Sequence, residues 1–133
     1  MKRKYLGFYL VFIFLLQGFG GGTKAENQNK NINITGIYSD MYYNKEGGDV
    51  LGSEIFLLYS AKGYFIVYQY SEGEPSVPLI TEAKVKDLTI EFTIQGTGNY
   101  NGTFKGNITR EGLKGKFENG YELNLKRKTS YWQ

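Results

Sequence analysis

The sequence predicts an all-β protein built as a closed, eight-stranded antiparallel up-and-down barrel. The chain of 133 residues contains 18 Gly and 12 Tyr but only 2 Pro, a composition typical of strands joined by turns. From residue 32 onward, short strand-like runs are separated by turn signals of hairpin length, and no stretch shows a sustained helical period. Closure into a barrel would remove exposed strand edges, with a two-sheet sandwich as the alternative.

Eight strand-like runs follow one another in a single expected domain, 33–133. They are expected at residues 36–43, 50–60, 64–71, 77–85, 88–95, 99–109, 112–117 and 121–128. Alternation of apolar and polar residues is clearest in the last four of these runs. In the run 88–95, for example, Ile90 and Phe92 share one face, and Thr89 and Glu91 share the other. Gly106 and Gly115 fall on the apolar face of their runs, and we interpret them as points of strand coiling that a small barrel needs to close.

Residues 1–25 have the pattern of a secretory signal peptide. Positive charges at residues 2–4 precede a twelve-residue uncharged run that begins at Tyr5, and small residues precede a cleavage site after Ala25, or alternatively after Gly22. Twelve helical residues span about 18 Å, which is short of a hydrocarbon core of about 30 Å. We therefore expect a secreted or periplasmic bacterial protein, with membrane contact only through this segment if it is not cleaved.

The positive net charge of the chain, +3, arises from the predicted targeting segment, which carries four basic and no acidic residues. The rest of the chain, which begins with an expected flexible leader at 26–32, holds 12 basic and 13 acidic residues. A nucleic-acid-binding protein would be expected to keep a basic surface in its mature domain, so no nucleic-acid partner is predicted. Residues 26–91 carry a net charge of −5 and residues 92–133 a net charge of +4. This difference reflects either ordinary solvated faces or a dipolar surface that orients a charged partner.

The absence of Cys and His restricts the chemistry of the chain. Disulfides, thiol and Ser-His nucleophile systems, and imidazole or thiolate zinc sites are all excluded. Carboxylates remain, since Asp40, Glu46, Asp49 and Glu54 cluster early in the mature chain, but their spacing matches no EF-hand loop. We expect a non-enzymatic protein without a cofactor or metal site, and a hydrolase that uses two carboxylates is an alternative.

A first candidate binding surface combines tyrosines with polar groups. Tyr38, Asp40, Tyr42 and Tyr43 would form a rim for a sugar or peptide if they meet at one end of the barrel. Near the C-terminus, a basic triplet precedes two aromatic residues. We expect Trp132 of this tail to cap an open barrel end.

A second candidate surface lies on the expected strands 50–60 and 64–71, which are apolar on both faces. Phe56, Leu58, Phe65 and Val67 are the residues that we assign to it. A strand pair of this kind needs cover on two sides. The cover could be a partner protein, a second copy in a homodimer, or the leader folded back. In the alternative interpretation, one face simply exposes tyrosines to water.

Six short motifs occur in the order found in a known kind of small β-domain. They are Val77-Pro78-Leu79, Leu88-Thr89-Ile90-Glu91-Phe92, Tyr100-Asn101-Gly102, Gly106-Asn107-Ile108, Leu113-Lys114-Gly115-Lys116-Phe117 and Leu123-Asn124-Leu125-Lys126-Arg127. With these motifs, residues 71–127 resemble the domain that accompanies secreted bacterial serine hydrolases of the α/β type. The resemblance implies a calycin-like, non-catalytic barrel and carries over no catalytic residue, because the accessory domain has none.

Together these features predict an exported, non-enzymatic binding or interaction module. Its expected partner is an extracytoplasmic protein, a peptide or a glycan, and an inhibitor would be one form of this function. A small-molecule carrier with the ligand inside the barrel is the remaining alternative.

Overall fold

The computed structural model describes residues 32–133, and every regular element in them is a β-strand. The strands are β1 (Gly36–Ser39), β2 (Tyr42–Asn44), β3 (Asp49–Ser60), β4 (Gly63–Gly73), β5 (Leu79–Lys86), β6 (Thr89–Ile94), β7 (Gly102–Ile108), β8 (Gly112–Phe117) and β9 (Glu122–Arg127). The described part of the chain has no helix of the length and hydrophobicity that a membrane span requires. The predicted signal peptide, 1–25, and all but the last residue of the predicted leader, 26–32, lie outside the described residues.

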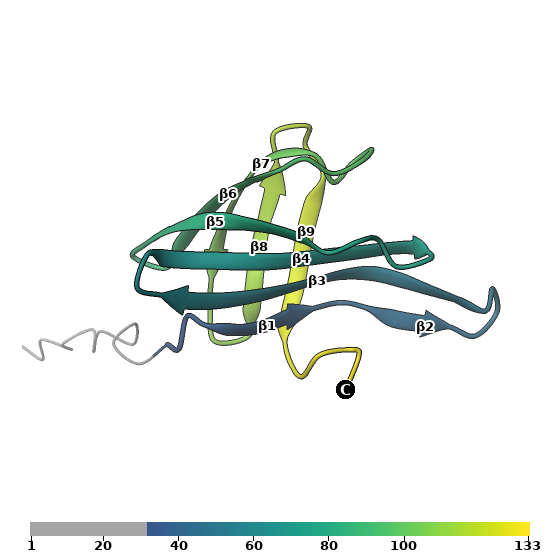
Figure 1. Cartoon of the computed structure of the whole chain (residues 1–133). Coiled ribbons are helices and arrows are strands. Elements are labelled where there is room, and N and C mark those ends of the chain that lie inside the picture. The colour runs from purple at the N-terminus through teal and green to yellow at the C-terminus, as the bar shows by residue number, and fades with distance from the viewer. Residues whose placement is uncertain (1–31) are drawn as a thin grey trace, which may run out of the picture.

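The strands form one sheet that closes on itself as an eight-stranded antiparallel barrel (Figure 1). From β3 to β9, each strand pairs with the next strand of the chain. β1 closes the ring, because it pairs with β3 on one side and with β9 on the other. β2 is an additional strand that pairs with β3. The predicted fold class is therefore confirmed, and the alternative of a two-sheet sandwich is wrong.

The predicted first run, 36–43, is divided into β1 and β2 by an interruption at Asp40 and Met41. The Asp40 carboxylate accepts a hydrogen bond from the Ser53 N–H at 2.6 Å, and the Asp40 N–H donates to the Ser53 carbonyl at 3.0 Å. Gly52 faces this interruption with φ of +108°, and a Cβ there would lie 2.8 Å from the Asp40 side chain. Past this point, β2, β3 and β4 continue beyond the barrel as a ribbon, on the right in Figure 1.

Two local differences from the predicted elements concern turns. The β5–β6 hairpin turns at Asp87 and Leu88, one residue later than expected, with φ of 49° and 68°. Positive φ at both central positions is characteristic of a type I′ turn, whose twist matches that of the paired strands. Residues 99–101, expected as strand, form a turn before β7, where the Tyr100 N–H donates to the Thr97 carbonyl at 3.0 Å.

Side chains that point inward occupy the barrel interior, following the predicted alternation. The phenyl rings of Phe92 and Phe104 stack with centroids 4.8 Å apart, and Phe117 meets Phe104 edge-on at 5.3 Å. A Cβ at Gly115 would lie 2.6 Å from the Phe104 ring and 2.5 Å from the Gly106 Cα, so glycine leaves the space that this ring fills. Each fully buried aromatic side chain contributes about 1.5–3 kcal/mol to folding.

Arg127, the last residue of β9, connects β9 to β1 at the point where the barrel closes. Only two residue pairs connect β1 to β9, and one of them is Tyr38 with Arg127. The Arg127 guanidinium donates to the Thr35 carbonyl at 3.0 Å, to the Asn33 carbonyl and to the Tyr38 hydroxyl at 2.6 Å. It also lies 4.6 Å from the centroid of the buried Tyr38 ring. This single side chain therefore reinforces a short strand pairing with three hydrogen bonds and a cation–π contact.

We expect Arg127→Lys to weaken closure of the barrel. A lysine keeps the charge but presents one compact ammonium, which cannot reach all three oxygens in the geometry of a planar guanidinium. The free energy of unfolding should fall by about 2–3 kcal/mol in urea denaturation. Lys126→Ala, an exposed neighbour on β9, should change it by less than about 0.5 kcal/mol. Equal losses in the two variants would contradict the role given to Arg127.

Alkaline pH should destabilise the barrel through its buried tyrosines. Burial raises the pKa of Tyr38, Tyr68 and Tyr100 above the ordinary value near 10, although Arg127 partly offsets this for Tyr38. The unfolded chain loses these protons at lower pH than the folded barrel, so the stability present below about pH 10 should fall as pH rises further. In urea denaturation, the free energy of unfolding of Tyr68→Phe should decline less above pH 10 than that of the unsubstituted protein. The exposed-site variant Tyr59→Phe should show the same decline as the unsubstituted protein. A free energy of unfolding that stays constant above pH 10 would refute this expectation.

Candidate functional site

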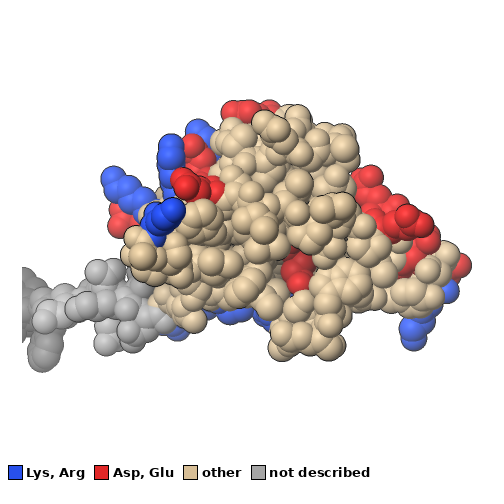
Figure 2. Space-filling view, viewed as in Figure 1, with Lys and Arg blue, Asp and Glu red and all other residues tan. Residues whose placement is uncertain are grey.

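The outer wall formed by β3 and β4 is apolar, as the sequence predicts for this strand pair. Phe56 lies opposite Val67, and Leu58 lies opposite Phe65, in the cross-strand register. Phe56 keeps 44% of its surface exposed, and the other three side chains are half-buried. Figure 2 shows this face as largely uncharged, with charged groups gathered toward its two ends.

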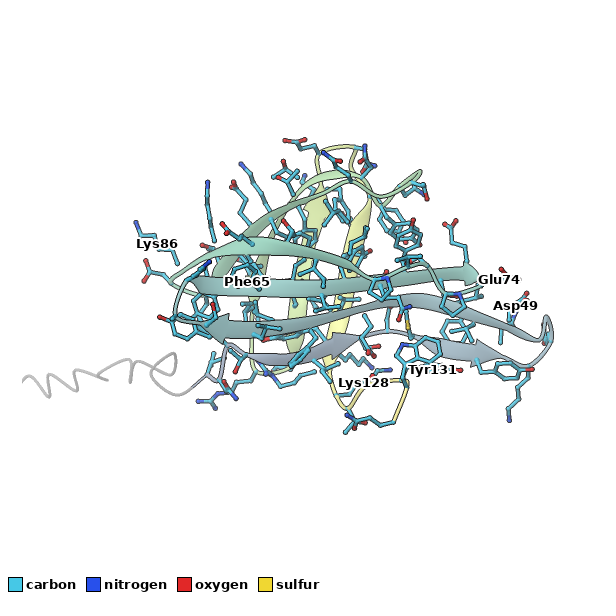
Figure 3. The ribbon with its side chains drawn as sticks, viewed as in Figure 1. Asp49, Phe65, Glu74, Lys86, Lys128 and Tyr131 are labelled. Carbon is cyan, nitrogen blue, oxygen red and sulfur yellow. The ribbon has the colours of Figure 1, made fainter. Side chains whose placement is uncertain are left out.

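The C-terminal tail, residues 128–133, supplies part of the cover for this wall. The Glu54 carboxylate accepts a hydrogen bond from the Ser130 hydroxyl at 2.6 Å and another from the Tyr131 N–H at 2.8 Å. The Lys128 ammonium donates to the Met41 carbonyl at 3.3 Å. Figure 3 shows Lys128 and Tyr131 beside β1 and β3. Glu54 is only 8% exposed, so its two bonds to the tail compensate for the burial of a carboxylate.

A groove of about 370 Å³ remains between the tail, the wall and the loop before β5. We call it the tail groove. Its lining residues are Ile37, Glu54, Phe56, Val67, Gln69, Pro78, Ser130, Trp132 and Gln133. Trp132 is 49% exposed and is the single tryptophan of the chain. The expectation that Trp132 caps a barrel end is therefore wrong, because the bonds of Glu54 to the tail hold it against the outer wall.

The opposite side of the tail groove is built by the β4–β5 loop. The Gln69 side-chain amide donates to the Ser76 carbonyl at 2.7 Å, and the Tyr70 N–H donates to the Ser76 hydroxyl at 3.2 Å. These bonds fix the loop that carries Pro78. The groove thus combines an apolar floor and two aromatic rings with one carboxylate and two amides, which suits an amphipathic ligand.

The predicted tyrosine rim does not form. Tyr38 is completely buried in the barrel wall, where its hydroxyl bonds Arg127 and the Ile34 carbonyl, so its assignment as a ligand-binding residue is wrong. The Asp40 carboxylate accepts a hydrogen bond from the Ser53 N–H at the strand interruption. Tyr42 and Tyr43 are each 54% exposed on β2, but successive residues of a strand point to opposite faces. They cannot form one surface with Tyr38.

The four predicted carboxylates do not converge on one position. Asp40 is bonded at the strand interruption and Glu54 is bonded to the tail, whereas Glu46 and Asp49 are exposed near the end of the ribbon. Figure 3 shows Asp49 near Glu74 at this end. Among residues 32–133, no group of three or more potential metal ligands is close enough to hold a metal ion.

Sequence reasoning identified the apolar wall but not the other components of the tail groove. Gln69, Pro78, Ser130 and Gln133 lie on separate segments, and no local pattern links them. One signal was present in the sequence, since Glu54 places a charge at the start of an apolar run in a central strand. A charge at such a position needs a partner, and the partner is the tail.

Comparison with protein-family models, curated proteins and solved structures finds no match to this chain. The functional interpretation therefore depends on the geometry of the tail groove itself.

We expect Glu54→Gln to loosen the tail. The glutamine amide would either turn its N–H₂ group to the Tyr131 N–H, which leaves one donor facing another, or donate to the Ser130 hydroxyl and keep only neutral hydrogen bonds in place of charge-assisted ones. Trp132 fluorescence should shift to longer wavelength and become more accessible to acrylamide, because this residue would enter water. Glu82→Gln, at an exposed position of β5, should change neither property. An unaltered Trp132 signal in Glu54→Gln would disprove the role of Glu54 in holding the tail.

Proposed function

We propose that the protein is an exported, non-enzymatic module that binds an extended peptide segment of a partner protein in the tail groove. The supporting observation is the way in which Glu54 binds the chain's own tail. Its carboxylate accepts one backbone N–H and one hydroxyl, which are groups that any peptide ligand can offer. Phe56 keeps 44% of its surface exposed in the same groove, and the position of the tail's Trp132 beside it indicates that apolar side chains of a ligand could be buried there.

A peptide fits the tail groove better than a glycan does. Ile37, Val67 and Pro78 supply aliphatic surface, which matches apolar side chains rather than a hydroxyl-rich sugar. The segment would take the place of the tail on Glu54, whose carboxylate would accept its N–H groups, and Gln69 would bond its other backbone groups. An inhibitor that covers a partner's surface is one form that this function could take.

The proposal that the module acts outside the cytoplasm rests on the signal-peptide pattern of residues 1–25. The protein would then be secreted or periplasmic. The resemblance of residues 71–127 to the accessory domain of bacterial serine hydrolases agrees with a non-catalytic module.

The other functions considered receive less support from the geometry. A carrier needs space inside the barrel, where the rings of Phe92, Phe104 and Phe117 pack against one another. A hydrolase needs two convergent carboxylates, whereas Asp40 and Glu54 are each engaged in a separate structural contact.

The tail itself provides a defined peptide with which to test the groove. A variant that ends at Lys128 retains all nine strands and contains no tryptophan. Fluorescence from Trp132 would then come only from a synthetic peptide of residues 129–133 added in trans. We expect the fluorescence anisotropy of this peptide to rise saturably, with a Kd of about 1 mM or tighter, since the intramolecular tail benefits from a millimolar effective concentration.

Two controls distinguish groove binding from nonspecific adsorption. Glu54→Gln in the truncated variant should weaken peptide binding about tenfold, because the carboxylate bonds are charge-assisted. A peptide with the same five residues in scrambled order should bind more weakly. Equal binding of both peptides, or no binding of either, would refute the peptide-binding function. Saturable quenching of Trp132 in the full chain by neutral oligosaccharides, without any effect of peptides, would favour the glycan instead.

A further inference from the structure

A second hollow, of about 890 Å³, crosses the outside of five strands, β5 to β9. We call it the lysine trough. Its lining residues are Lys84, Val85, Lys86, Thr89, Ile90, Glu91, Lys105, Gly106, Asn107, Lys114, Gly115, Lys116, Glu122, Leu123 and Asn124. It shares no residue with the tail groove, so an inference about it goes beyond the function proposed above.

Cross-strand register arranges the outward side chains of the lysine trough in two parallel rows. The first row, read from β5 to β9, is Lys84, Glu91, Lys105, Lys116 and Glu122. The second row, in the same order, is Lys86, Thr89, Asn107, Lys114 and Asn124. The backbone of the inward-facing residues between them forms the floor. The rows are two residues apart, about 7 Å, and four strand spacings make them about 19 Å long.

The lysine trough carries an excess of positive charge that the fold does not require. It has five lysines and two glutamates, and of these five described lysines only Lys105 forms an ion pair, with Glu91 at 3.4 Å. Lys105 and Lys116 lie directly opposite each other on β7 and β8. Like charges at such positions destabilise a sheet. A bound anion would offset this repulsion.

The polar residues between the lysines indicate which kind of anion fits. Thr89, Asn107 and Asn124 offer both donors and acceptors, which suit the hydroxyl groups of a sugar. No aromatic side chain lines the trough to stack on a base, as single-stranded nucleic acid requires. No large exposed apolar side chain among its lining residues could anchor it in a membrane.

We propose that the lysine trough binds a linear acidic polysaccharide. The carboxylate or sulfate groups of the polymer would pair with the lysines of both rows, and its hydroxyls would bond Asn107, Asn124 and Thr89. A single polymer chain would lie between the rows, across the strands. The trough lies on a different wall from the tail groove, so the two ligands could be bound together.

Binding of fluorescently labelled alginate oligosaccharides, which carry one carboxylate on each sugar, tests the proposal. The full mature chain should bind them saturably, and affinity should fall as salt is raised. The double variant Lys105→Gln/Lys116→Gln should bind at least tenfold more weakly while its urea denaturation midpoint is unchanged or higher, because the repulsion between the two lysines is removed. Lys45→Gln/Lys62→Gln is the matched control, since it removes the same charge from exposed turns outside the trough.

The control pair should bind alginate within about twofold of the unsubstituted protein, because long-range attraction between exposed charges is screened by salt. Asn107→Ala/Asn124→Ala should weaken binding of alginate several-fold but leave binding of inorganic polyphosphate, which lacks hydroxyls, unchanged. If the two double lysine variants lose alginate affinity equally, the proposal would be overturned in favour of nonspecific attraction. Equal or tighter binding of neutral dextran, polyphosphate, single-stranded DNA or anionic phospholipid vesicles would also overturn it.

Discussion

The pairing of β1 with both β3 and β9 is the constraint on which the rest of the structure depends. Without it, the strands would form an open sheet with two exposed edges. The β1–β9 contact is short, with two residue pairs, and the Arg127 guanidinium strengthens it through the Tyr38 ring and two backbone carbonyls. Closure also buries the aromatic side chains whose ring contacts fill the interior.

The same closure builds the tail groove. Ser39 of β1 pairs with Glu54 on one side and with Lys126 on the other. The chain therefore leaves β9 beside the strand that neighbours Glu54, and four residues are enough to bring Ser130 to the carboxylate. The site is thus a consequence of strand register, and a barrel closed in another register would separate Glu54 from the tail.

The lysine trough has a related origin on another wall. Its lysines belong to three different strands, β5, β7 and β8, and only the pairing of β5 through β9 aligns them in rows. Glu91 and Glu122 are acidic residues of the trough itself, whereas Asp49 and Glu74 lie at the end of the ribbon in Figure 3, far from Lys86. The two lysine rows do not follow the charge difference between the halves of the sequence, because Lys84 and Lys86 belong to the acidic half, 26–91.

The sequence by itself determined the strands, the order of the hairpins, the inward faces and the doubly apolar pair β3 and β4, because alternation and turn residues are local properties. It could not place Tyr38, since an aromatic residue with period-2 spacing can face either side of a strand. It also could not pair Glu54 with Ser130, which is 76 residues away. The tertiary structure decided these features, and the alignment of the lysine rows, because register and closure arise from contacts between distant segments that no local pattern encodes.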